Sequence, residues 1–427
     1  MGGALIGTGP GRWPRRHVVV AFSFLACAIA YTDRVNIAVA AVAMKEQLGW
    51  SQTEKGLVLS AFFVGYLVFM FAAGLITARV GGKRVLGWSV LAWSICVLAT
   101  PPAAALSMTA LMATRIGLGV GEAGMFPAFY EIFSRWVPPQ ERTRALARVL
   151  SGIPIGTIVG LAGSAWLVAH LGWPAAFYVF GAAGLLWVIF WTRGVEADPA
   201  SDARVGASER ALLVGMAAST PAVDKLPLRR LLLRAPVAAI VTAHFTGNWS
   251  LYVLVSWLPS YFRDVQGLSI ANAGLYSAAP WLALLAANNV SANLTDRMIA
   301  RGVSVATMRK FMQCTGLGAA AVMLLMIRFA HSPAEALVML CAATAALGCT
   351  WSGFPAAVLD IAPRHGAVLY AFSNTFATIP GIVGVAVTGW LVDVTGTYSA
   401  AFALAAAICA VGALVFGLLF NDRVVVA

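Results

Sequence analysis

The chain has 427 residues, of which 60% are hydrophobic and 11% are charged, and its formal net charge is +12. Soluble globular domains carry roughly a quarter charged residues. These figures therefore exclude a soluble enzyme, a disordered chain and a nucleic-acid-binding module. The six cysteines lie in apolar stretches without metal-ligand spacing, which indicates neither a disulfide framework nor a zinc site. We expect no metal and no cofactor.

Twelve mostly apolar segments are each long enough to cross a bilayer as a helix, which takes about 20 residues. The first segment continues past signal-peptide length and contains Asp33 and Arg34, so we do not expect a cleaved signal. The sequence predicts an all-α membrane protein with spans at 18–43, 54–77, 85–105, 107–133, 146–169, 173–192, 236–262, 272–296, 308–330, 334–359, 366–391 and 398–420.

Lysine and arginine are distributed unevenly among the connecting segments. With the N-terminus inside, 23 of the 29 lie on the cytoplasmic side, four lie in outer loops and two lie within spans. Cytoplasmic loops are enriched in these residues, so the asymmetry predicts that both termini are cytoplasmic. The same asymmetry accounts for the net positive charge, so nucleic-acid binding is not needed to explain it. The four outer residues are Lys45, Lys55, Arg263 and Arg328.

A polar segment at 193–235 separates two sets of six spans, which predicts one bundle at 1–192 and a second at 236–427. Short motifs recur in both sets. Gly49-Trp50-Ser51 recurs as Gly267-Leu268-Ser269, an offset of 218, and Phe126-Pro127-Ala128 recurs as Phe354-Pro355-Ala356. Parallel repeats of this kind are typical of transporters whose substrate site lies between the repeats near the bilayer midplane.

Ionisable residues inside spans are costly and tend to mark a transport pathway. Arg34 is the candidate anion anchor, because its guanidinium is permanently charged and its donors match a carboxylate. The alternative is a structural ion pair with a neighbouring helix. Arg115 and Glu122 share a helix face but lie two turns apart, so each needs a partner elsewhere. Asp33 is the natural partner for Arg115.

Burial and a nearby arginine shift the pKa of a carboxylate in opposite directions. A carboxylate whose arginine contact changes with conformation can therefore load and release a proton. Asp33 and Glu122 are the candidate proton carriers, with structural networks as the alternative. His244 can also titrate near neutral pH, although a lone histidine in a span is more often a packing residue. The glycines around Glu122 indicate close helix packing.

Other polar and aromatic side chains lie at a comparable depth in the spans and are candidate substrate contacts. Hydroxyls, amides and aromatic edges suit an oxygen-rich anion, although tyrosine and tryptophan are also common packing residues. A buried amide needs hydrogen-bond partners, which favours a site role for Asn374. The candidates are Tyr31, Tyr66, Asn248, Trp249, Tyr252, Trp351, Ser352 and Asn374.

Five motifs together resemble the major facilitator superfamily over essentially the whole chain. More narrowly, they resemble its anion:cation symporter branch, which includes bacterial sugar-acid transporters, animal sialin, vesicular glutamate transporters and plant plastid anion transporters. The motifs are YTDRVNIAVA at 31–40, RIGLGVGEAGMFPAF at 115–129, RWVPPQER at 135–142, NWSLYVLVSWLPSYF at 248–262 and DIAPRHGAVLYAFSNTFATIPG at 360–381.

The resemblance implies a fold of two six-helix bundles that rock to move organic anions, often coupled to protons. It implies that Arg34 binds the substrate carboxylate, that Asp33 and Glu122 couple protons, and that Arg115 pairs with these acids. Tyr31, Tyr66 and Asn374 resemble substrate-contacting positions of the family.

The sequence departs from the family pattern at three positions. Ala78 stands where the family usually has an acid before the arginine of the loop after span 2. Vesicular glutamate transporters carry an additional histidine and arginine at the positions of Leu59 and Gly247. Because those cations are missing here, we expect a monocarboxylate as substrate rather than a dicarboxylate.

These observations predict a proton-coupled symporter of small, sugar-acid-like organic monoanions. We expect a monomer in the lipid bilayer of a bacterial inner membrane. One alternative is an efflux antiporter for metabolites or drugs, but such carriers often accept cations or neutral compounds, against which Arg34 argues. A second is a transport-derived sensor, which typically has a soluble output domain. A membrane enzyme is not expected, because the sequence shows no catalytic constellation.

Overall fold

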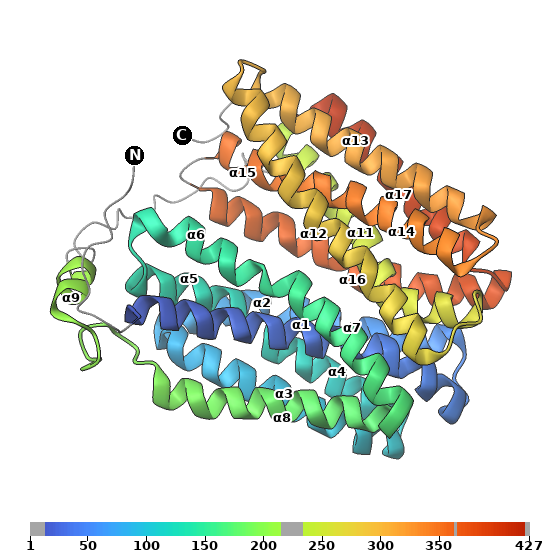
Figure 1. Cartoon of the computed structure of the whole chain (residues 1–427), viewed down its shortest axis with the longest axis horizontal. Coiled ribbons are helices and arrows are strands. Elements are labelled where there is room, and N and C mark those ends of the chain that lie inside the picture. The colour runs from blue at the N-terminus through green and yellow to red at the C-terminus, as the bar shows by residue number, and fades with distance from the viewer. Residues whose placement is uncertain (1–12, 215–233, 363–364, 423–427) are drawn as a thin grey trace. The chain divides into compact units, whose positions relative to one another are not determined.

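A computed structural model describes residues 13–214, 234–362 and 365–422 of the chain (Figure 1). Within these residues, ten helical segments are long and apolar enough to cross a membrane. Two further predicted spans are also helical. One consists of α4 (Met108–Glu122) and α5 (Met125–Trp136), and the other is α11 (Ala235–Asp264). The predicted all-α architecture of twelve spans is confirmed.

The polar segment predicted after span 6 contains one short helix, α9, within its described residues. Residues 215–233 of that segment lie outside the described residues. The elements before it are α1 (Arg15–Leu48), α2 (Gln52–Val80), α3 (Gly82–Leu106), α6 (Pro139–Leu150), α7 (Gly152–Leu171), α8 (Trp173–Gly194) and α9 (Ala207–Val214). Those after it are α12 (Ile270–Ala300), α13 (Val305–Met326), η1 (Ile327–Phe329), α14 (Pro333–Cys349), η2 (Thr350–Ser352), α15 (Phe354–Ile361), α16 (Gly366–Thr395) and α17 (Ser399–Leu419).

The repeated sequence motifs adopt matching local structures. The span predicted at 107–133 breaks between α4 and α5, and the span predicted at 334–359 breaks between η2 and α15. In both cases Phe-Pro-Ala lies in the first turn of the helix after the break, where proline is tolerated. Gly49 and Gly267, which are equivalent in the repeat, both have positive φ, at 70° and 66°. Glycine is the residue that adopts this conformation without strain.

The chain divides into two compact units, and each contains pieces from several parts of the sequence. Unit 1 consists of Met1–Asp33, Val68–Gly156 and Phe177–Ala222, in so far as these are described. Within it α3 packs on α4 and α5, and the Thr32 hydroxyl donates to the Gly156 carbonyl at 3.0 Å.

Unit 2 consists of Arg34–Leu67, Thr157–Ala176 and the described part of Val223–Ala427. Within it α11 packs on α16 and α17, α12 on α14, and α13 on α14 and α17. Its core includes Val237, Ile240, Phe354, Ile361, Leu369 and Phe416. The division into 1–192, 193–235 and 236–427 stays a prediction.

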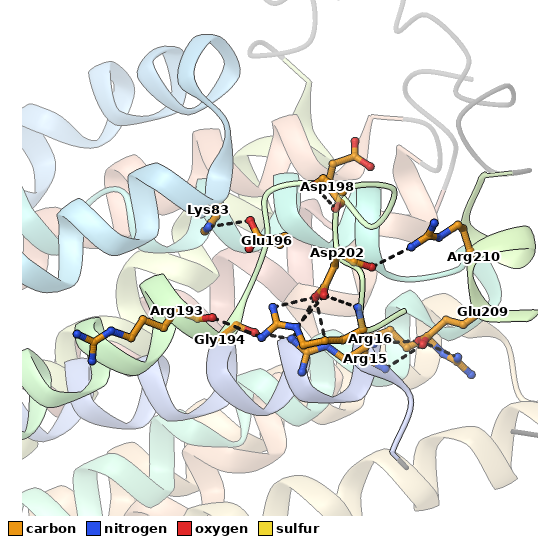
Figure 2. A network of polar contacts seen from close by, with 12 residues as sticks. Arg15, Arg16, Lys83, Arg193, Gly194, Glu196, Asp198, Asp202, Glu209 and Arg210 are labelled. Carbon is orange, nitrogen blue, oxygen red and sulfur yellow. Dashed lines mark hydrogen bonds and ion pairs between the residues drawn. The ribbon is translucent and has the colours of Figure 1, made fainter. Parts of the chain in front are cut away.

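A polar network in unit 1 joins the beginning of α1 to the segment after α8 (Figure 2). Glu209 of α9 accepts hydrogen bonds from the backbone N–H groups of Arg15 and Arg16, at 2.9 and 3.0 Å, and so caps α1. Asp202, which is 1% exposed, pairs with Arg15 at 3.2 Å and with Arg204 at 2.7 Å. Burial acts to raise the pKa of Asp202, but the hydrogen bonds from Arg204 and the charge of Arg15 hold it below its usual value.

Candidate substrate and proton-coupling site

Three of the predicted proton-coupling residues form a buried cluster in unit 1. Asp33 lies on α1, and Arg115 and Glu122 lie on α4. Their exposed fractions are 0%, 1% and 0%. The charges of both Glu122 and Arg115 act on the Asp33 carboxyl. The structure therefore brings together the two acids and the arginine that the sequence singled out.

Close packing of α4 against α3 holds this cluster in place. A Cβ atom at Gly121 would lie 2.9 Å from the backbone nitrogen of Trp93, so a glycine is needed for this approach. Trp93 is fully buried. The Trp93 side chain also acts on the Asp33 carboxyl. The close contact of α3 with α4 therefore brings Trp93 to the proton-coupling candidates.

Arg34 follows Asp33 in the chain and lies among aromatic side chains of unit 2. Its guanidinium carbon lies 4.6 Å from the ring centroid of Phe62 and 5.3 Å from that of Tyr66. These two rings stack, with centroids 5.8 Å apart. Guanidinium groups are attracted to aromatic faces at such distances. Phe62 was missed in the sequence, although it lies one helical turn before the candidate Tyr66.

The candidates on α11 contact α2 and α16, also within unit 2. The Asn248 amide donates to the Ala377 carbonyl at 3.1 Å and to the Tyr252 hydroxyl at 3.3 Å. The Tyr252 ring lies 4.6 Å from that of Phe63 of α2. Trp249 is buried against α16, where a Cβ at Gly384 would lie 3.1 Å from its ring. These contacts fit the packing alternative for Trp249.

The remaining candidates of unit 2 lie on or beside α11, η2 and α16. Ser352 is buried, and its hydroxyl lies 2.9 Å from that of Ser291. His244 is 3% exposed, and its Nδ1 atom lies 3.0 Å from the Ser373 hydroxyl. The His244 ring also lies 4.6 Å from that of Phe354. This arrangement fits the packing alternative for His244. Trp351 and Asn374 are half-buried, as is Tyr31 in unit 1.

Lys55 lies elsewhere than the sequence predicted. It was assigned to an outer loop, but the structure places it in the first turn of α2 with 1% exposure. The available signal was its position just inside the span predicted at 54–77. The roles assigned to the site residues stay predictions, whereas their positions are as described.

The sequence matches the Major Facilitator Superfamily over residues 23–384. The chain belongs to this family. A similar protein is the "Sodium-dependent phosphate transport protein 1, chloroplastic" of Arabidopsis thaliana, 36% identical over 95% of this chain and 79% of that protein. Another is the "Ascorbate transporter, chloroplastic" of the same plant, 33% identical over 95% of this chain and 75% of that protein. The predicted resemblance to plant plastid anion transporters is confirmed.

Solved structures support the same fold. A bacterial homologue of the lysosomal transporter Spinster matches with a TM-score of 0.75 at 17% identity, covering 98% of this chain and 100% of that one. A D-xylose-proton symporter matches with a TM-score of 0.76 at 14% identity, covering 95% and 98%. These structures show the major facilitator fold. The family match and the similar plant proteins show that the protein is a multi-pass membrane transporter and not an enzyme.

Proposed function

We propose that this protein is a proton-coupled symporter of small organic monocarboxylates resembling sugar acids. We further propose that it acts as a monomer of two six-helix bundles, in a bacterial inner membrane with both termini cytoplasmic. The observation that carries the proposal is the buried cluster of Asp33, Arg115 and Glu122. The names of the similar plant proteins, which mention phosphate and ascorbate, support an anionic substrate.

The charge balance of the cluster supports proton coupling. Two ionised carboxylates and one arginine would leave a net negative charge in a fully buried site, which is costly. One bound proton makes the cluster neutral. We propose that Glu122, and with it Asp33, takes up this proton when the site faces outward. When the site opens to the cytoplasm, water reaches the cluster and stabilises its net negative charge, so the proton is released there. Arg115 then pairs with both carboxylates, which resets the empty carrier.

The surroundings of Arg34 support recognition of a carboxylate. In the proposal its guanidinium binds the substrate carboxylate while the faces of Phe62 and Tyr66 fix its orientation. The half-buried Asn374, with Asn248 and Tyr252 of the same unit, supplies hydrogen bonds to substrate hydroxyls. The substrate contact expected for Tyr31 stays a prediction. Substrate binding needs to favour one conformation by only a few kcal/mol to shift the population.

Uptake into proteoliposomes tests the proposal. Glu122→Gln should abolish accumulation driven by a proton gradient but retain exchange of labelled for unlabelled substrate, because exchange needs no net proton movement. Glu335→Gln, which changes an exposed carboxylate that caps the start of α14, should behave as the unchanged protein. Accumulation that survives Glu122→Gln would overturn the proton assignment.

The same vesicles distinguish the rival functions. A sodium gradient replaces the proton gradient in one arm, because a similar plant protein is named as sodium-dependent. Sugar acids, ascorbate, inorganic phosphate and lipophilic cations serve as competing solutes. Competition by lipophilic cations alone would favour the efflux antiporter and would contradict a substrate-binding Arg34.

A further inference from the structure

At one end of unit 2, the first turn of α2 meets two helices from the second half of the sequence. We call this contact the α2 seam, formed by residues 52–56 of α2, 257–264 of α11 and 385–393 of α16. The Asp393 carboxylate accepts hydrogen bonds from the backbone N–H groups of Gln52 and Thr53, at 3.0 and 2.7 Å. It also accepts from the Thr53 hydroxyl at 2.5 Å. The first N–H groups of a helix have no partner within the helix, so Asp393 caps α2 from a distant part of the chain.

A lysine is buried in the same seam. Lys55 is 1% exposed, its Nζ donates to the Ser260 hydroxyl at 2.9 Å, and it lies 4.6 Å from the Trp257 ring centroid. The charges of Asp264 and Asp393 act on it through space. Removing an ammonium group from water is expensive unless it is well paired. A hydroxyl and a ring face replace only part of its hydration.

At the residue after Lys55, α2 lies close to α16. A Cβ atom at Gly56 would lie 3.2 Å from the Val385 carbonyl oxygen, which also accepts a hydrogen bond from the Trp257 indole at 3.1 Å. A small separation of α2 from α16 would therefore admit water to Lys55.

The internal repeat shows that helix packing alone does not require this lysine. The offset of 218 places Ala273 and Gly274 of α12 at the positions of Lys55 and Gly56. There, a Cβ at Gly274 would lie 2.2 Å from the Ala165 Cβ of α7, so the equivalent contact is close and apolar. The fold thus forms the matching contact with alanine where α2 has a charged residue.

We infer that the α2 seam is a gate held in balance by two opposed groups. Asp393 favours the closed seam, because it caps α2 only when the helices touch. Lys55 favours opening, because its ammonium regains water when they part. The inference rests on the alternating access of the proposed function, but it concerns the gate and not the substrate or the coupling ion.

Distances between spin labels on α2 and α16 test the inference without any substrate, so its failure is distinguishable from failure of the uptake experiments. Labels at Leu57→Cys and Val394→Cys are suitable, because both side chains are exposed. The unchanged protein, treated with the same spin label, gives the background signal from its native cysteines. Asp393→Ala should increase the ratio of separated to closed seams by about tenfold, the typical contribution of a charge-assisted hydrogen bond.

Adding Lys55→Met to Asp393→Ala should return the ratio toward that of the unchanged protein. Thr53→Val removes only the hydrogen bond from the Thr53 hydroxyl to Asp393, so it should change the ratio of separated to closed seams less than Asp393→Ala does. It replaces Asp393→Ala in the test if that variant does not fold. Glu335→Gln, which changes an exposed carboxylate at the start of α14 and away from the seam, is the control and should have no effect. An Asp393→Ala distribution identical to the control, or a double variant as open as Asp393→Ala, would overturn the inference.

Discussion

Arg34 lies over two aromatic rings that are one helical turn apart on α2. Its planar guanidinium can contact these rings and a carboxylate at the same time, which the ammonium group of a lysine cannot do. A cation in this position is therefore specified by shape as well as by charge. A lysine at position 34 would keep the positive charge but lose this shape.

Arg34→Lys should weaken substrate binding by at least about tenfold, because the two-pronged hydrogen bond and the stacking are both lost. The apparent affinity from competition uptake measures the change. Tyr66→Phe keeps the ring beneath the guanidinium and should have a smaller effect. Equal affinities for Arg34→Lys and the unchanged protein would contradict the role of Arg34 as anchor.

At the level of single residues, the sequence identified charges by their rarity inside apolar spans. This was sufficient for Asp33, Arg115 and Glu122, which the fold brings together. It was insufficient for Phe62, since an aromatic residue in an apolar span is unremarkable until a cation lies above it. It also failed for Lys55, because counting a charge at the end of a span with the loops ignores its position just inside the span predicted at 54–77.

The contact between α3 and α4 depends on a glycine, and this makes the position of Glu122 sensitive to one added methyl group. Gly121→Ala should destabilise the protein by about 1–3 kcal/mol, the usual cost of overpacking. The reason is that the new Cβ would meet the Trp93 backbone at 2.9 Å. Thermal unfolding in detergent measures the loss.

Gly318→Ala provides the matched control for Gly121→Ala. Gly318 lies in α13, and an added Cβ there meets no atom within 4 Å. Alanine has a higher helix propensity than glycine by up to about 1 kcal/mol, so this substitution should be neutral or stabilising. Equal melting temperatures for the two variants would show that α3 can move away from α4 without cost.

The contact between α1 and the segment after α8 contributes to stability, and this contribution should depend on pH through Asp202. Because the pKa of Asp202 is lowered in the folded state, its contribution is complete above the unfolded value of about 3.9. The contribution is lost as the pH falls through the lower, folded value. Asp202→Asn should reduce stability by about 1–3 kcal/mol at neutral pH and should have no effect at pH values below the folded pKa.

Melting temperatures measured from pH 7 down to about pH 2, well below the usual pKa of a carboxyl group, follow this dependence. Asp198→Asn is the comparison, since its side chain is half exposed and lies 3.7 Å from Arg135. Surface pairs of this kind contribute about 0–1 kcal/mol. A difference between Asp202→Asn and the unchanged protein that stays constant with pH would exclude Asp202 as the titrating group.

The helices themselves were largely predictable, because a bilayer requires long apolar segments with internally satisfied backbones. The breaks before Phe126 and Phe354 were not predicted, although the Phe-Pro-Ala repeat marks both of them. Helix α9 was also missed, since eight residues in a polar segment give no apolar stripe long enough to recognise. Its importance comes from the distant hydrogen bonds of Glu209, which a local pattern cannot show.

For the whole molecule, the two halves share an architecture but differ in the chemistry of equivalent positions. Lys55 and Ala273 illustrate this, as do Ala78 and Asp296 near the ends of α2 and α12. A duplicated fold can therefore have one polar seam and one apolar seam without changing the packing of its helices. In the proposed gate, this asymmetry makes two equivalent contacts at the same end of the helices differ in their tendency to part. Which solution they face depends on the membrane orientation.

The uneven distribution of lysine and arginine predicts that orientation. Ser208→Cys in α9 and Thr397→Cys between α16 and α17 lie at exposed positions on predicted opposite sides of the membrane. In intact bacterial cells, a maleimide that cannot cross the membrane should label Thr397→Cys and leave Ser208→Cys unlabelled until the cells are lysed. The unchanged protein gives the background, since its six cysteines lie within helices. The reverse labelling pattern would place α9 and the basic segments outside, and the proposed direction of proton release would then be wrong.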